Sequence, residues 1–143
     1  MKILSTLGCV PLCVLSALAC AAPAPWNAEA DWKEAQAEMG RVMEQLRGQN
    51  EILDTIRDRE TANSGAMKLM DNFTRYFAAV SRLDVLVGRL DASEQRALER
   101  GVRSEFMLRK EAVHAKIQAL QAADCYGSEA LQAAFGLYFR HGN

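Results

Sequence analysis

Proline is missing from most of this 143-residue sequence, because its three copies are Pro11, Pro23 and Pro25. The chain after Pro25 is instead rich in Ala, Leu, Glu, Gln, Arg and Met, which are strong helix formers. Proline breaks helices, so its absence removes the main obstacle to long ones. We therefore predict an all-α body.

Cysteine is equally scarce, with Cys9, Cys13, Cys20 and Cys125 as its four positions. Only Cys125 lies beyond the first twenty residues, and a lone cysteine cannot form an internal disulfide. Two alternatives follow for Cys125: a buried inert thiol, or an intermolecular disulfide in an oxidising compartment.

No single sign of charge dominates, since 17 Lys and Arg residues balance 18 Asp and Glu residues. Nucleic-acid binding requires a basic surface, so this composition argues against such a partner. Ligand motifs for metal or haem are also missing: there is no His-x-x-x-His pair and no Cys-x-x-Cys-His. One Glu-x-x-His occurs, Glu111 with His114, whereas a di-iron site needs two. We predict no catalytic residue, no metal site and no cofactor.

Charge is absent from Ile3 to Ala22, directly after Lys2, and small residues end this apolar run. This pattern predicts a signal peptide over residues 1–21, with cleavage near Ala19 to Ala21. The run is also about as long as a membrane span, so an uncleaved anchor is the alternative. Residues 22–28 then form a short linker, which Pro23 and Pro25 stiffen.

The end of the leader, Ser16-Ala17-Leu18-Ala19-Cys20, resembles a bacterial lipobox. The resemblance implies that Cys20 is acylated and becomes the first residue of the mature chain. Ala21 follows it rather than an aspartate, which in enteric-type sorting implies the outer membrane. We predict a lipoprotein that faces the periplasm, with a soluble periplasmic protein as the alternative.

Residues 29–143 are predicted to form one helical domain. A first helix is expected over residues 29–60, a turn over residues 61–65, and a second helix from Met67 to Leu90. Their apolar positions recur every three or four residues. On the first helix they are Trp32, Ala35, Met39, Val42, Leu46, Leu53 and Ile56, interrupted by Gln49; on the second they are Met67, Met70, Phe73, Phe77, Val80, Leu83, Val87 and Leu90, broadened by Leu69, Tyr76 and Leu86.

Two further helices complete the expected fold. Asp91 with Glu94 has the spacing of a capping box, which predicts the start of a third helix that ends at about Ala123. Gly127 and Ser128 predict a left-handed stop and a new cap before a short helix over residues 129–140. Short loops force antiparallel neighbours, so we predict an antiparallel helical bundle of three long helices plus a short C-terminal helix.

An exported helical chain that has no recognisable catalytic or metal-binding motif indicates a protein that binds other proteins without catalysis. We predict an accessory or assembly factor of a secretion or conjugation apparatus, an immunity protein or a chaperone. Its partner would be another envelope protein or a second copy of itself, and lipid at Cys20 would add a membrane anchor. Candidate contact residues are Phe135, Tyr138 and Phe139 of the last helix, although docking on the bundle explains the same aromatics. The alternative function is a periplasmic small-ligand or metal-binding bundle used in sensing or stress protection.

The leader can be tested by intact-mass spectrometry of the mature protein from its native envelope fraction. We expect a chain that begins at Cys20 and carries added acyl mass. A chain that begins near Ala22 without lipid would support the soluble alternative. A doubled mass that collapses on reduction would show a disulfide between two copies.

Overall fold

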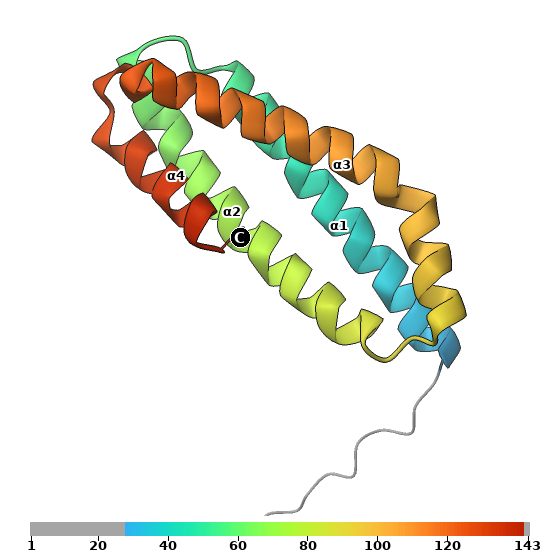
Figure 1. Cartoon of the computed structure of the whole chain (residues 1–143). Helices are drawn as coiled ribbons and strands as arrows, with labels where there is room; N and C mark the ends of the chain where they lie inside the picture. Colours follow the sequence, from blue (N-terminus) through green and yellow to red (C-terminus); the bar gives the residue numbers. More distant parts are fainter. Residues whose placement is uncertain (1–27, 142–143) are drawn as a thin grey trace, which may run out of the picture.

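The chain folds into four α-helices and one short turn element within residues 28–141, which are the residues that the structure, a computed structural model, describes. The helices are α1 (Ala28–Asp54), α2 (Arg59–Val87), α3 (Ala92–Ala122) and α4 (Glu129–His141), and the turn η1 (Asp124–Gly127) lies between α3 and α4. Figure 1 shows three long antiparallel helices with the short α4 beside them. The predicted fold class is confirmed.

The predicted boundary between the first two helices is wrong. α1 ends at Asp54, the chain turns over residues 55–58, and the expected turn residues form the first turns of α2. The Asp58 carboxylate accepts a hydrogen bond from the Thr61 backbone N–H at 2.8 Å, while the Thr61 hydroxyl accepts one from the Asp58 N–H at 3.1 Å. This capping box starts α2, and such caps contribute about 1 kcal/mol.

Gly65 explains why the sequence suggested a turn in the wrong place. It is buried inside α2, and a Cβ atom built on it would lie 3.0 Å from Ile56 Cδ1. Its small size therefore allows the buried Ile56, in the turn, to approach α2 closely. Glycine here marks close packing between segments and not a chain reversal.

The core-facing side of α2 differs in part from the predicted apolar stripe. Leu69, Phe73 and Tyr76 are buried, whereas Met67 and Met70 are exposed. Met67 and Met70 belong to the predicted apolar stripe but do not face the core, so this part of the stripe was wrong. The stripe predicted on the first helix is confirmed from Trp32 to Leu53, because its members are buried or partly buried, while Ile56 is buried in the turn after α1.

The last two junctions agree with the sequence. Asp91 caps α3 by accepting hydrogen bonds from the backbone N–H groups of Ser93 and Glu94, at 2.7 and 2.9 Å. Ser128 Oγ accepts a hydrogen bond from Leu131 N–H at 3.1 Å and donates one to Asn63 Oδ1 at 2.6 Å, which ties the start of α4 to α2.

The turn η1 has an unusual backbone. Asp124, Cys125 and Tyr126 have φ values of 50°, 50° and 51°, and Gly127 follows with 69°. The left-handed stop predicted at Gly127 is therefore present, but three non-glycine residues precede it in the same region. Each such residue costs roughly 1–2 kcal/mol relative to right-handed backbone. Packing of α4 must offset this strain.

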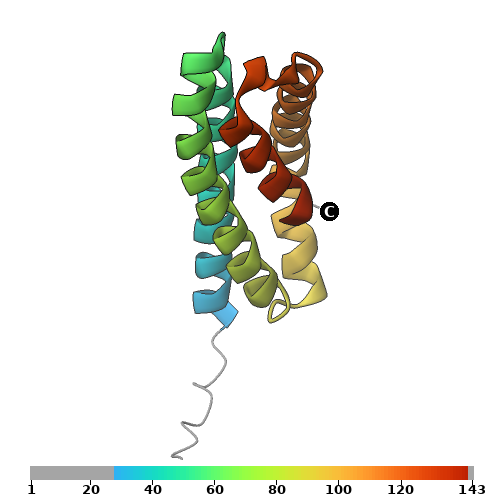
Figure 2. The same cartoon turned by 90° about the vertical axis from the view of Figure 1, so that its left-hand side faces the viewer.

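The helices are not packed symmetrically. α1 packs against both α2 and α3, and α4 packs against α2. The described part of the chain shows no comparable packing of α3 against α2 or α4. Figures 1 and 2 show that α4 runs beside the first half of α2 and stops partway along it.

Gln49 is an exception in the core, because it is fully buried and neither polar atom of its side-chain amide has a hydrogen-bond partner. A buried amide without partners is unfavourable by about 1–3 kcal/mol. We expect Gln49→Leu, which keeps the volume similar, to raise the free energy of unfolding by about 1–2 kcal/mol in urea denaturation. The exposed Gln36→Leu is the control and should change it by less than about 0.5 kcal/mol. A less stable Gln49→Leu variant would contradict this account.

Candidate functional site: a trough between α2 and α3

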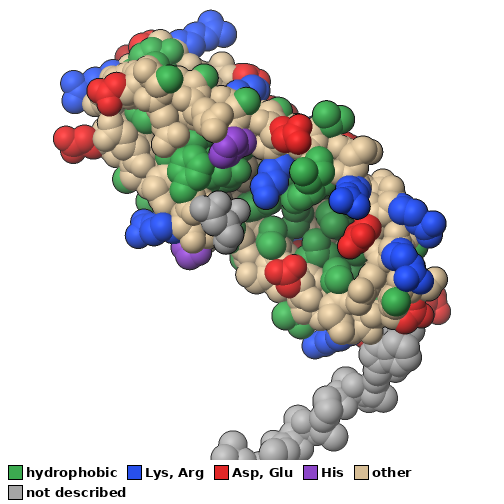
Figure 3. Space-filling view, in the orientation of Figure 1, with side chains coloured by type: hydrophobic (Ala, Val, Ile, Leu, Met, Phe, Trp, Pro, Cys, Tyr) green, Lys and Arg blue, Asp and Glu red, His purple; other side chains and the backbone are tan. Residues whose placement is uncertain are grey.

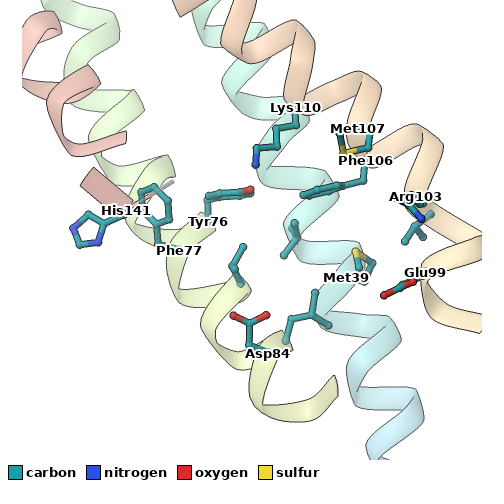
Figure 4. A pocket seen from close by; sticks show the side chains of 14 residues that line it. Met39, Tyr76, Phe77, Asp84, Glu99, Arg103, Phe106, Met107, Lys110 and His141 are labelled. Atoms are coloured by element: carbon teal, nitrogen blue, oxygen red, sulfur yellow. The ribbon is translucent and has the colours of Figure 1, made fainter. Parts of the chain in front are cut away.

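An open trough lies between α2 and α3, with α1 as its floor (Figures 3 and 4). Its volume is about 520 Å³. The residues that line the trough are Met39 and Val42 from α1, Tyr76, Phe77, Val80, Leu83 and Asp84 from α2, Glu99, Val102, Arg103, Phe106, Met107 and Lys110 from α3, and His141 at the end of α4.

The trough exists because α4 is much shorter than α2. Their 13 and 29 residues correspond to lengths of about 20 and 44 Å. α4 contacts α2 through Tyr138 on Phe73 and His141 on Phe77, with ring centroids 5.1 and 5.2 Å apart. Beyond Phe77, no described residue fills the position of a fourth helix. Val80, Val102 and Phe106 consequently remain only partly buried.

Charged side chains line the rim of this apolar trough. Asp84 and Glu99 lie on opposite walls toward the end away from α4, and Lys110 lies toward α4 (Figure 4). Among the salt bridges between described residues, none includes Asp84, Glu99, Arg103 or Lys110. Elsewhere on α3, by contrast, Arg109 pairs with Glu105 at 2.7 Å. The rim charges are therefore available to a partner.

Tyr76 contributes a hydroxyl group to the trough. Its side chain is 7 % exposed, and Figure 4 shows the hydroxyl pointing from α2 toward α3. Burial, and secondarily the nearby Tyr138, raises the pKa of Tyr76 to about 12. The group is therefore neutral and able to donate a hydrogen bond at any physiological pH.

A second, smaller groove continues along α3 beside α4. Its volume is about 360 Å³, and it shares Met107 and Lys110 with the trough. His114 and Phe139 lie across it, with ring centroids 5.9 Å apart. Two grooves therefore run along the side of α3 that faces α2 and α4.

The contact residues predicted on the last helix lie mainly inside the bundle. Phe135 and Tyr138 are buried, so docking on the bundle accounts for them. Phe139 is partly buried and lines the smaller groove. The sequence analysis assigned Val80 and Leu83 to the apolar stripe of the second helix, where they were expected to pack inside the bundle, and so missed the trough that they line. The sequence did contain a signal for the trough, because the predicted last helix is too short to cover the whole of the second helix.

Cys125 is buried in η1 with 2 % of its surface exposed, and it does not line the trough. Burial and the negative charge of Asp124 raise the pKa of its thiol, which disfavours the reactive thiolate. A disulfide between two copies would require η1 to open, and it stays a prediction.

Glu111 and His114, the Glu-x-x-His pair of the sequence, lie on α3. In the part of the chain that the structure describes, no group of three His, Cys, Asp or Glu side chains is placed to hold a metal ion. His114 instead lies 3.0 Å from Gln118, measured between the Nε2 atoms.

The predicted leader, its cleavage region, Cys20 and most of the linker lie outside the described residues. Of the helices within residues 28–141, none is both long and apolar enough to span a membrane. Comparison with known proteins finds no family model, curated protein or solved structure that matches this chain.

The buried tyrosines can be tested by titrating tyrosinate absorbance after rapid mixing to alkaline pH. Tyr76 should ionise at about pH 12, well above the ordinary tyrosine value of about 10. Because the folded-state pKa is raised, Tyr76 favours the folded state below about pH 10, and this contribution is lost as the pH rises through 12. Tyr76→Phe should remove the transition at about 12, whereas Tyr138, whose pKa burial also raises, still ionises in this variant. Ionisation of all three tyrosines together in the native protein would contradict the burial of Tyr76.

Proposed function

We propose that this protein is an exported, non-catalytic binding protein that holds a helical segment of another envelope protein in the trough. The observation that carries the proposal is the half-empty position of a fourth helix between α2 and α3. Apolar side chains of three helices converge there without a covering element among the described residues. Exposed apolar patches with a polar rim are typical of protein interaction sites.

The open form of the trough favours a helix over a small molecule. Pockets for small ligands enclose most of the ligand surface. Here the rim residue Met107 is 44 % exposed, and Asp84, Glu99 and Arg103 on the rim are exposed as well. An amphipathic helix needs burial on one face only, and grooves between helices are a recurrent way to bind one.

The proposed location is the periplasm, where lipid on Cys20 would tether the protein to the outer membrane. Support comes from the apolar leader, the lipobox-like end and the short linker before α1. A tethered binding protein would suit the role of an accessory or assembly factor of a secretion or conjugation apparatus, an immunity protein or a chaperone.

A small apolar ligand is the second candidate for the trough. The observation in its favour is the volume of about 520 Å³, which is within the usual range for ligand pockets. Such a ligand would stabilise the protein against heat, because it binds only the folded state.

Site-specific photocross-linking in the native cells tests the main proposal. A photoreactive residue in place of Met107, on the trough, should form a cross-link to one partner protein. The cross-linked peptide of that partner should have the sequence pattern of a helix with an apolar face. The matched control is Met67, which is 76 % exposed on α2 and does not line the trough. The cross-linked peptides are identified by mass spectrometry.

Equal trapping of the same proteins from Met67 and Met107 would contradict the proposal. Filling the trough by Val80→Trp should abolish the Met107 product while the melting temperature stays close to that of the parent protein. A persistent product in this variant would also count against binding in the trough.

A further inference from the structure

We infer that the helix bound by the trough carries a carboxylate at one end of its apolar face and a cation about eleven residues away. This inference rests on the proposed function, and it deepens it by naming the chemistry of the partner. The inference is based on the distribution of charge along the rim, where carboxylates lie at one end of the trough and an ammonium group lies toward the other (Figure 4).

The end of the trough away from α4 is acidic. Asp84 on α2 and Glu99 on α3 lie there on facing walls (Figure 4). Neither carboxylate has a salt bridge with a described residue, and Glu99 does not pair with Arg103 one turn later. A cation on the bound helix would meet two carboxylates at this end.

The end near α4 is basic. Lys110 extends from α3 toward Tyr76, whose hydroxyl points from α2 toward α3 (Figure 4). The His141 ring at the end of α4 points away from Lys110, and Arg103 lies on α3 between Glu99 and Lys110 (Figure 4). The acidic Glu111 lies beside Lys110 in the smaller groove.

A carboxylate is the partner group that suits Lys110 and Tyr76 together. The ammonium and the phenol can both donate to one carboxylate, and hydrogen bonds with charged groups are stronger than neutral ones. Lys110 is also partly buried, so an unpaired ammonium there gains from a counter-ion.

The spacing follows from α3 itself. Glu99 and Lys110 are separated by eleven residues, or about 16 Å of helix. Eleven residues are close to three turns, so both charges lie on the same side of a helix. A bound helix that runs along α3 would present its two charges at the same separation, beside apolar residues seated on Val42, Leu83 and Val102.

The test uses four synthetic amphipathic peptides with one shared apolar stripe and the mature full-length protein. Their two flanking residues, eleven positions apart, are Lys then Glu, Glu then Lys, two Lys, or two Glu. Dissociation constants are measured by fluorescence anisotropy. We expect one of the two mixed-charge peptides to bind about tenfold more tightly than either uniform peptide, because charge complementarity mainly sets selectivity.

Charge reversal at Lys110 sharpens the test. Lys110→Glu should weaken the preferred peptide about tenfold and strengthen the two-Lys peptide. The control is Lys68→Glu, since Lys68 is exposed on α2 and does not line the trough. It should leave all four affinities unchanged.

Equal affinity for all four peptides, no binding of any peptide, or no effect of Lys110→Glu would overturn the inference. Failure of the proposed function has a different signature, which is the loss of a specific cross-link from Met107. A specific cross-link together with four equal affinities would leave helix binding in place and remove the charge pattern.

Discussion

Burial of α1 between two other helices is the constraint on which the rest of the structure depends. Among the helices within residues 28–141, α1 alone packs extensively against two long helices, α2 and α3. Its stripe includes the fully buried Ala35 and Leu46, together with the polar Glu38 and Gln49. Glu38 accepts a hydrogen bond from Arg82 of α2 at 2.9 Å and pairs with Arg41 of its own helix. The positions of α2 and α3, and the distance between them, are therefore set by the surface of α1 against which both helices pack.

A trough is the geometric result of this arrangement. Two helices that both rest on a third leave a groove above it, and a four-helix bundle would fill that groove. Here α4 fills one half, because it contacts α2 at Phe73 and ends at the level of Phe77. The other half keeps apolar walls and a rim of unpaired charges, a combination that suits a removable partner better than a permanent core.

Much of the fold could be predicted because local signals agreed with it. Absence of proline after Pro25 and the capping residues Asp91 and Ser128 all indicate what the structure contains. The first turn was misplaced because Asn63, Ser64 and Gly65 have the composition of a loop, whereas Gly65 in fact serves close packing against Ile56. The candidate site depends on where α4 stops along α2, which is a tertiary relation that periodicity does not encode. Val102 and Phe106 have the pattern of core residues, and only the missing neighbour makes them a surface.

The left-handed turn η1 bears on how the molecule opens. α4 is a short helix, and three non-glycine residues with left-handed backbone join it to α3. This conformation is unfavourable for residues other than glycine. Strain in this connection lowers the free energy needed to open it, whereas the buried Leu131 and Phe135 of α4 oppose the release of the helix. Release of η1 and α4 together would uncover Phe73 and the first half of α2. The half-length trough would then become continuous along α3, and the protein would have a second binding state whose surface is about twice as long.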